Sequence, residues 1–336
     1  MDFKMNVNPF GPPKWLSQYL SESLQDAIDY PDYKNIDVNN AIAEFLNLPE
    51  KNVAVANGSL EAIFAIPRLV DSSNPTIVFP TYWGYKAALD TLNINFNKII
   101  LKEDNNFEFD INEINDRASK STLLFICNPN NPTGTYIQKK ELLNIITQNP
   151  NCHFFIDEAH LILKDIYEKE TLSQHVKELD NLTLIYSTSK IFNVGGLRTG
   201  IVVSNEKLIQ AFRKFQVPYS TSTITQKAFI RMLKDKEFIE YMKNHLESTT
   251  RDFSDRLKTI PWLKVMETKT HFVLCKIITP SITAVELASR LKEDGFGIRE
   301  CTTSYSELCG EWVRITSNTR TNNKKLINKL KSYNIK

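Results

Sequence analysis

The sequence lacks the long hydrophobic runs and clustered charges that would connect it with a membrane or with nucleic acid. No stretch of its 336 residues approaches 18 consecutive apolar residues, so we expect no membrane-spanning helix. The formal net charge is +2, and Lys and Asn are scattered rather than gathered into a basic tract. The first residues also lack the apolar core and small-residue cleavage site of a signal peptide. We therefore predict a cytoplasmic protein that binds neither membrane nor nucleic acid.

Cysteine is scarce, and the glycine motifs of several common enzyme folds are missing. The five cysteines are odd in number and show neither CxxC nor zinc-ligand spacing, so we expect free thiols and no metal site. No GxGxxG follows a predicted strand, and neither GxxxxGK[ST] nor GxSxG occurs. These absences argue against a nicotinamide dehydrogenase, a P-loop enzyme and a serine hydrolase.

What is present is an alternation of short apolar runs with amphipathic segments of helix length. Six runs are rich in β-branched and aromatic residues and are predicted strands: 53–56, 76–79, 123–127, 153–156, 182–186 and 201–204. Helical spacing lies between them, at 60–69, 84–92, 139–147 and 206–215. This alternation predicts an α/β fold with a mostly parallel sheet covered by helices on both faces.

The pattern changes after about residue 220. A helical stretch at 223–258 contains no Pro or Gly and could connect two domains. Beyond it, predicted strands at 272–276, 297–299 and 312–316 alternate with helices at 284–293 and 322–333, which indicates a smaller α+β domain. Four prolines in the first forty residues indicate a segment that wraps around the main sheet. We predict an N-terminal segment at 1–40 that joins the small domain, a large domain at 41–240 and the small domain at 241–336.

Three polar residues follow predicted strands, where open α/β sheets bind their ligands. Asn131 lies in the run NPNNPTG, Asp157 ends one strand, and Lys190 follows another. An amide can bond a phenolate oxygen, a carboxylate can pair with a pyridinium, and a lysine amine can form a Schiff base with an aldehyde. These are the handles of pyridoxal 5′-phosphate (PLP), and they predict amino-acid chemistry. Singly, Asp157 could instead cap a helix or pair with an arginine, and Lys190 could reach solvent.

Other residues are candidates for holding the rest of such a cofactor. Gly58 and Ser59 lie between a predicted strand and a helix, whose free N–H groups favour a phosphate. Ser187, Ser189 and Arg198 could add hydroxyl and guanidinium donors. A tight turn without a ligand is the alternative for the glycine segment.

Aromatic and arginine residues are candidates for the ring and for the substrate. Tyr82 could stack on a flat cofactor ring, or it could pack in the core. Arg314 lies between apolar Val313 and Ile315, in the polar-facing slot of an alternating strand. With Arg299 it could clamp two anionic groups of a substrate, such as a carboxylate and a phosphate. Solvent-exposed ion pairing is the alternative for both arginines.

Over nearly its full length the chain resembles fold-type I PLP enzymes, the aspartate aminotransferase superfamily. Four runs carry the resemblance in the family's order: NPNNPTG at 128–134, DEA at 157–159, STSK at 187–190 and GLR at 196–198. The resemblance implies a large domain with a mostly parallel seven-stranded sheet, a small α+β domain and bound PLP.

The same resemblance implies a role for each candidate. Lys190 would carry the cofactor and move protons, Asp157 would pair with its pyridinium, and Tyr82 would act with them by stacking on its ring. Asn131 would contact the ring hydroxyl, and the phosphate would fall to Gly58, Ser59, Ser187, Ser189 and Arg198.

Tyr30 resembles the tyrosine that reaches this phosphate from the neighbouring subunit, which implies a homodimer with shared active sites. Arg314, helped by Arg299, resembles the arginine that binds the substrate's anion.

Within the superfamily, the sequence is similar to two groups that act on phosphorylated substrates. They are the histidinol-phosphate aminotransferases and the L-threonine-O-3-phosphate decarboxylases of cobamide synthesis. The opening run at 6–12 resembles both and places Asn8 among the expected substrate contacts. Val7, where the aminotransferases usually carry an acidic residue, and the run GIRECT at 297–302 favour the decarboxylases.

The resulting prediction is PLP-dependent decarboxylation of O-phospho-L-threonine or O-phospho-L-serine. Transamination of the histidinol-phosphate type is the alternative, and a non-catalytic protein that binds PLP or a ligand is a more remote one.

Three residues depart from the family pattern. Leu60 stands where a polar residue usually follows Gly58 and Ser59, which could remove one phosphate donor. His160 replaces the Tyr or Phe that is common after DEA, and His271 replaces a frequent Asn. The two histidines are candidate substrate contacts, and ordinary packing is the alternative for each.

Overall fold

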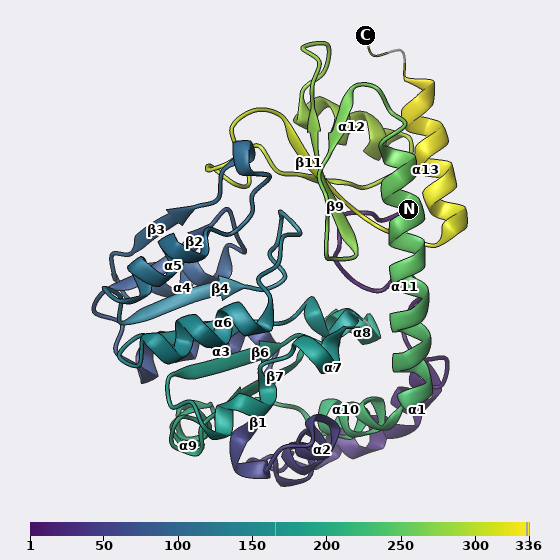
Figure 1. Cartoon of the computed structure of the whole chain (residues 1–336). Helices are drawn as coiled ribbons and strands as arrows, with labels where there is room; N and C mark the ends of the chain where they lie inside the picture. The colour runs from purple at the N-terminus through teal and green to yellow at the C-terminus, as the bar shows by residue number, and fades with distance from the viewer. Residues whose placement is uncertain (165, 334, 336) are drawn as a thin grey trace.

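The structure is a computed structural model that describes residues 1–164, 166–333 and 335. Two β-sheets organise the chain, with a long helix running along one side from the larger to the smaller (Figure 1). The larger sheet has seven strands, as predicted, and their order is β1-β7-β6-β5-β4-β2-β3. Its strands are β1 (Val53–Asn57), β2 (Pro75–Phe79), β3 (Asn97–Ile100), β4 (Leu123–Cys127), β5 (His153–Asp157), β6 (Leu182–Tyr186) and β7 (Thr199–Ser204).

The larger sheet is mostly parallel, which the sequence also predicted. Strand β7 pairs antiparallel with both β1 and β6, while the pairs from β6 through β5, β4 and β2 to β3 are parallel. All six predicted strands match within two residues at each end. Strand β3 was missed because it lies at the edge of the sheet and buries only Ile99, so its sequence forms no apolar run.

Helices bury both faces of this sheet, which explains why its strands are apolar throughout. In β4, Leu124 and Ile126 pack in one core cluster, and Leu123 and Phe125 pack in another on the opposite face. The helices of this part are α2 (Ile36–Leu46), α3 (Ser59–Leu69), α4 (Gly84–Asp90), α5 (Ile111–Ala118), α6 (Lys139–Gln148), α7 (Tyr167–Glu170), α8 (Thr188–Phe192) and α9 (Glu206–Phe215).

The smaller sheet is antiparallel, with the strand order β10-β11-β9-β8. Phe3 joins its core, since the Phe3 N–H donates to Gly297 O at 2.7 Å and Phe3 O accepts from Thr316 N at 2.8 Å. Phe3 therefore lies against the small sheet, while the predicted division of the chain into an N-terminal segment and two domains stays a prediction. The elements are β8 (Leu263–Val265), β9 (Phe272–Ile277), α12 (Ala284–Glu293), β10 (Arg299–Glu300), β11 (Trp312–Thr316) and α13 (Arg320–Ser332).

The predicted helical stretch at 223–258 is two helices, α10 (Thr223–Lys234) and α11 (Lys236–Leu257), rather than one. Asp235 breaks it, with ψ at 69° and a carboxylate that caps the Phe238 N–H at 3.1 Å. The same carboxylate accepts from Trp15 Nε1 at 2.6 Å. Helix α11 does connect the two sheets: its Met242 joins the core of the larger one, and its Phe253 joins the core of the smaller one.

Short helical segments complete the chain. The N-terminal segment, predicted only to wrap around, contains α1 (Leu16–Glu22), which lies against α10. The 3₁₀ segments are η1 (Ser23–Ile28), η2 (Glu50–Asn52), η3 (Glu103–Asn105), η4 (Leu161–Leu163), η5 (Ser173–Lys177) and η6 (Gly195–Leu197).

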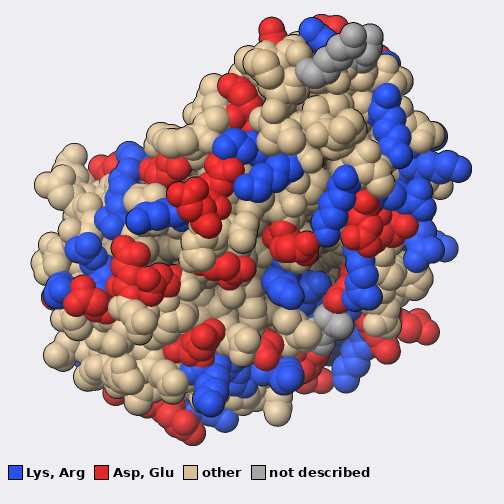
Figure 2. Space-filling model, turned by 45° about the horizontal axis from the view of Figure 1, so that its top comes forward, with Lys and Arg blue, Asp and Glu red and all other residues tan. Residues whose placement is uncertain are grey.

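The surface in Figure 2 shows acidic and basic side chains intermingled over the visible face, in keeping with the net charge of +2. Among the described residues, no helix combines the length and the apolar composition needed to cross a bilayer. The cysteines are free thiols, as predicted, and Cys309 is the exposed one among them.

Candidate active site

The carboxyl ends of β4, β5 and β6 bring together the residues that the sequence singled out. Asp157 is the last residue of β5 and lies in register with Cys127 of β4 and Ile185 of β6. The loop after β4 carries Asn131, and the short helix α8 after β6 carries Lys190. Parallel strands that end at one edge thus gather all three side chains there.

Asp157 is buried, with 5% of its surface exposed, and two donors hold its carboxylate. Tyr85 Oη donates to Oδ2 at 2.7 Å, and the Ala159 N–H donates to Oδ1 at 2.9 Å. Burial raises the pKa of Asp157, while these hydrogen bonds and the charge of Lys190 lower it. A carboxylate fixed in this way is placed to pair with a cationic group.

Lys190 lies in a site that lowers the pKa of its amine. Burial lowers its pKa, the positive charge of Arg314 lowers it further, and Asp157 opposes both effects. A neutral amine is the form that reacts with an aldehyde, so this environment suits a lysine that binds a carbonyl cofactor.

Asn8 holds the turn that contains Lys190. Its backbone N–H donates to Lys190 O at 2.9 Å, and its side-chain amide donates to Gly11 O and to Ile191 O. Its Oδ1 accepts from the Phe10 N–H at 2.8 Å. Because backbone groups take up the whole side chain, the geometry gives Asn8 a positioning role, and its contact with substrate stays a prediction.

Arg198 lies against the turn between β1 and α3, which is the predicted phosphate site. A Cβ added to Gly58 would lie 2.1 Å from Arg198 Nη2 and would push the guanidinium aside, and the φ of +74° itself favours glycine. Arg198 itself has a φ of +55°, and its Nη1 donates to Gly195 O at 2.9 Å. A Cβ at Gly200 would lie 2.6 Å from Ser59 N, so β7 also approaches closely here.

The donors at this turn fit a phosphate dianion. The N-terminus of α3 begins at Ser59, Arg198 supplies a guanidinium, and Ser187 and Ser189 are buried in the turn after β6. Ser189 Oγ already donates to Thr199 O at 3.2 Å. Leu60 packs against the neighbouring core cluster and adds no donor of its own side chain.

Arg314 is buried and lies on β11, a strand of the small sheet. Its Nη1 donates to Asn131 Oδ1 at 2.5 Å, and its Nη2 donates to Lys4 O at 2.8 Å. The first bond turns the Asn131 carbonyl toward Arg314. Arg299 is the cross-strand partner of Arg314, and its charge adds to the burial that lowers the Arg314 pKa.

Tyr82 and Tyr30 occupy different surroundings. Tyr82 is half-buried, 5.8 Å from the Tyr85 ring, and burial raises its pKa to about 12. Tyr30 is 85% exposed, and its ring lies 5.2 Å from that of Tyr219 with an angle of 51° between the ring planes.

Two residues of the site were missed in the sequence. Tyr85 lies three residues after Tyr82 in an aromatic cluster, and that spacing was the available signal. Tyr305 donates from Oη to Asn131 Oδ1 at a long 3.5 Å, from a loop without any pattern.

The two remaining candidates, His160 and His271, lie together with their ring centres 5.4 Å apart.

The family model for aminotransferase class I and II matches residues 1–330. The chain belongs to this family. Its cofactor is PLP, and the lysine, carboxylate and phosphate donors described above fit that group.

Relatives of the chain carry two kinds of name. The chain is 29% identical to the adenosylcobalamin biosynthesis bifunctional protein CobDQ of Leptospira interrogans, over 97% of this chain and 38% of that protein's length. It is 27% identical to a protein of Caldanaerobacter subterraneus provisionally named threonine-phosphate decarboxylase (97% and 88% covered). It is 26% identical to the histidinol-phosphate aminotransferase of Methanococcus aeolicus (97% and 88%).

Solved structures share the fold. The histidinol-phosphate aminotransferase of Clostridium acetobutylicum superposes with a TM-score of 0.91 at 24% identity, with 98% of each chain covered. The L-threonine-O-3-phosphate decarboxylase of Porphyromonas gingivalis gives 0.87 at 24% identity, over 99% of this chain and 98% of that one.

Replacing Gly58 with Ala should weaken PLP binding. The new Cβ would displace the Arg198 guanidinium, and one lost charge-assisted hydrogen bond corresponds to roughly 10- to 100-fold in affinity. Gly196→Ala is the matched control, because a Cβ there meets no atom within 4 Å. Cofactor titration followed by visible absorbance measures both variants, and equal affinities would show that the contact between Gly58 and Arg198 is unimportant.

Glu158, next to Asp157, makes the stability of the cofactor-free protein depend on pH. Its Oε2 accepts from Thr171 Oγ1 at 2.7 Å, its Oε1 accepts from the Leu172 N–H at 2.9 Å, and burial raises its pKa to about 7. The folded protein keeps this proton up to about pH 7, whereas the unfolded chain releases it near its ordinary value of 4.5. Stability from this group is thus greatest at low pH and is lost as pH rises.

The Glu158→Gln variant should escape that loss, because glutamine does not titrate. Its free energy of unfolding relative to wild type should rise by about 2–3 kcal/mol between pH 5 and pH 8. Urea unfolding of the cofactor-free proteins measures the difference, with Glu240→Gln on the exposed face of α11 as control. A difference that stays constant with pH would mean that Glu158 is not held protonated.

Proposed function

We propose that the chain is a PLP-dependent decarboxylase of an O-phospho-L-amino acid, either threonine phosphate or serine phosphate. The observation that carries the proposal is the buried Arg314, whose charge acts on the half-buried Lys190 and whose cross-strand partner is Arg299. Two arginines suit a substrate with two anionic groups. The name of the Caldanaerobacter relative and the residues Val7 and GIRECT at 297–302 support decarboxylation in particular.

The cofactor contacts are proposed from geometry and resemblance together. Lys190 would hold the cofactor through its amine, Asp157 would pair with the pyridine nitrogen, Asn131 would bond the ring hydroxyl, and Tyr82 would stack on the ring. Arg198 and the start of α3 would hold the phosphate, together with Gly58, Ser59, Ser187 and Ser189.

Bound PLP supplies an electron sink for the pair of electrons left on Cα when a bond to that carbon breaks. Arg314, helped by Arg299, orients the phospho-amino acid so that the bond to the carboxylate is the one that breaks. The carboxylate leaves as carbon dioxide, and Lys190 Nζ delivers a proton to Cα. The amine phosphate then departs, and a proton from solvent restores Lys190.

Transamination of the histidinol-phosphate type is the second candidate. The similarity to histidinol-phosphate aminotransferases, at nearly the same identity and coverage as to the decarboxylases, favours it. In that case the proton on Cα is lost instead of the carboxylate, and Lys190 Nζ is the group placed to take it.

The two reactions are separated by their products. Purified holoenzyme given O-phospho-L-threonine or O-phospho-L-serine should release carbon dioxide, and Lys190→Ala should abolish the release. Formation of glutamate from 2-oxoglutarate and histidinol phosphate, without carbon dioxide, would establish the aminotransferase instead. Absorbance that shifts with ligand while neither product forms would indicate a binding protein.

We further propose that the enzyme is a homodimer in which Tyr30 reaches the cofactor phosphate of the partner subunit. Tyr30 is 85% exposed and lies in an aromatic group with Tyr33 and Tyr219, so its hydroxyl is open to a partner subunit. Sedimentation of the holoenzyme should give twice the chain mass of 38.7 kDa. Tyr30→Phe should keep that mass and weaken PLP binding several-fold, because it removes one hydroxyl donor.

A mass of one chain would contradict the dimer. Unchanged PLP affinity in the Tyr30→Phe dimer would contradict the role of this hydroxyl.

A further inference from the structure

His160 and His271 come from distant parts of the chain and form one buried pair. His160 directly precedes η4, and His271 directly precedes β9, and they are only 4% and 2% exposed. Their rings are tilted by 49° with centres 5.4 Å apart. The Phe272 ring lies beside them, 5.0 Å from the His160 ring and 5.2 Å from Cζ of Arg314.

Three nitrogens of this pair have no hydrogen-bond partner among the residues that the structure describes. They are Nδ1 of His160 and both ring nitrogens of His271. By contrast, the half-buried His153 pairs its Nε2 with Thr183 Oγ1 at 2.8 Å. Buried polar groups in folded proteins are nearly always partnered, so unpartnered imidazoles inside an active site point to a ligand.

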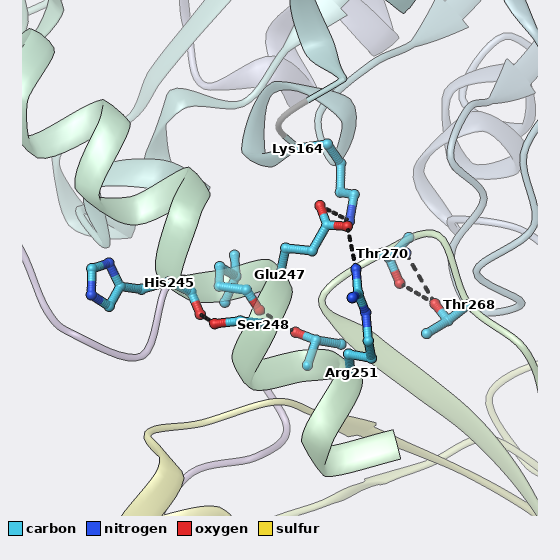
Figure 3. Close-up of polar contacts among 9 residues, drawn as sticks. Lys164, His245, Glu247, Ser248, Arg251, Thr268 and Thr270 are labelled. Carbon is cyan, nitrogen blue, oxygen red and sulfur yellow. Dashed lines mark hydrogen bonds and ion pairs between the residues drawn. The ribbon is translucent and has the colours of Figure 1, made fainter. Parts of the chain in front are cut away.

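The charges around the pair are mainly positive. Lys190 of α8 and Arg314 of β11 act on both rings, and Lys164 acts on His271. Lys164 is balanced by Glu247 of α11, at 3.1 Å, and Glu247 also bonds Arg251 at 3.3 Å (Figure 3). Arg314, in contrast, makes no ion pair within the described part of the chain, and only neutral oxygens accept its hydrogen bonds.

We propose that His160 and His271, together with Arg314, form the subsite for the phosphate group of the substrate, and that the imidazole pair takes up one proton when this phosphate binds. That this phosphate belongs to a phospho-amino acid rests on the function proposed above.

The arrangement of donors favours phosphate over carboxylate. A planar carboxylate is satisfied by the two-pronged guanidinium of one arginine. Here the donors come from three separate elements of the chain: Arg314 from β11, His271 from the residue before β9, and His160 from the segment between β5 and η4. A tetrahedral group with three terminal oxygens can use all three, and the tilt between the rings suits it.

Uptake of a proton follows from the chemistry of imidazole. Burial lowers the pKa of His271 to about 3 and that of His160 well below its ordinary value, so both rings are neutral at pH 7 in the free site. The backbone of Asn6 lies near enough to oppose this for His271, without a hydrogen bond of acceptable geometry.

A neutral ring presents one N–H donor and one lone pair, and the lone pair repels a phosphate oxygen. Protonation from solvent turns that lone pair into a donor and supplies a positive charge, so a bound dianion raises the pKa of the pair. Mutual repulsion of the two rings limits the uptake to one proton.

Inorganic sulfate is the probe for this linkage, because it stays a dianion from pH 5 to pH 9. Holoenzyme is used, so that the cofactor's own phosphate occupies the site at Arg198. Calorimetric titration at pH 7 in two buffers of different protonation enthalpy counts the protons exchanged. We expect about one proton taken up per sulfate bound, as one imidazole would accept.

Glutamine variants separate the proton from the hydrogen bond. Each of His160→Gln and His271→Gln keeps a neutral N–H donor and should bind sulfate roughly tenfold more weakly, since neutral hydrogen bonds are about half as strong as charged ones. The double variant should take up no proton. His245→Gln, on the exposed side of α11 (Figure 3), is the matched control and should behave as wild type.

Two results would overturn the proposed uptake of a proton by the imidazole pair. One is sulfate binding without proton uptake in the wild type, and the other is unchanged uptake in the double variant. Unaltered cofactor absorbance in each variant excludes a folding defect as the cause of lost binding.

Competition identifies the group that the subsite takes. Propyl phosphate should displace sulfate at pH 7, and propionate at the same concentration should not. Displacement by propionate alone would assign the subsite to a carboxylate and refute the phosphate.

This outcome is independent of turnover. An enzyme that shows the proton linkage but releases no carbon dioxide refutes the decarboxylase alone, and one that decarboxylates without the linkage refutes the subsite alone.

Discussion

The site depends on keeping one carboxylate buried at the end of β5. Asp157 loses the hydration that would stabilise its charge, and Tyr85 and the Ala159 N–H replace part of it. The rest of the cost of burying this carboxylate is offset by nearby positive charge. Lys190 is placed to supply that charge in the cofactor-free enzyme, and a pyridinium would supply it with PLP bound. Burial also lowers the pKa of Lys190. The same exclusion of water therefore shifts the pKa values of both groups toward their neutral forms, and the attraction between their charges opposes that shift.

Much of the fold could be predicted because burial on both faces leaves a clear trace in the strands. Strands β4, β5 and β6 are apolar at nearly every position, since each face has its own core, and their short length separates them from helices. Strand β3 could not be predicted, because an edge strand that is open to solvent needs few apolar residues. The break at Asp235 was missed because a single Asp within a long helical pattern is a weak local signal, and the Trp15 contact that also holds its carboxylate comes from 220 residues away.

The cofactor site was predictable to the extent that it is local in sequence. Asn131, Asp157 and Lys190 each follow a recognisable strand, and topology then brings them together. Tyr85 and Tyr305 were missed because they act through hydrogen bonds to residues far away in the sequence, Asp157 and Asn131. A tyrosine in a helix or loop carries no sequence pattern that predicts such a bond. For His160 and His271 the sequence showed two separate departures, and only the structure shows that they meet.

Helix α11 is fastened at two points, with Met242 and Leu246 in the core of the large sheet and Phe253 and Leu257 in that of the small one. Between these anchors, Thr250 Oγ1 donates to Leu246 O at 2.7 Å, a contact that tends to bend a helix. A rod held at both ends lets its ends rotate only by flexing in between. Any change in the angle between the two sheets must therefore bend α11 between Leu246 and Phe253.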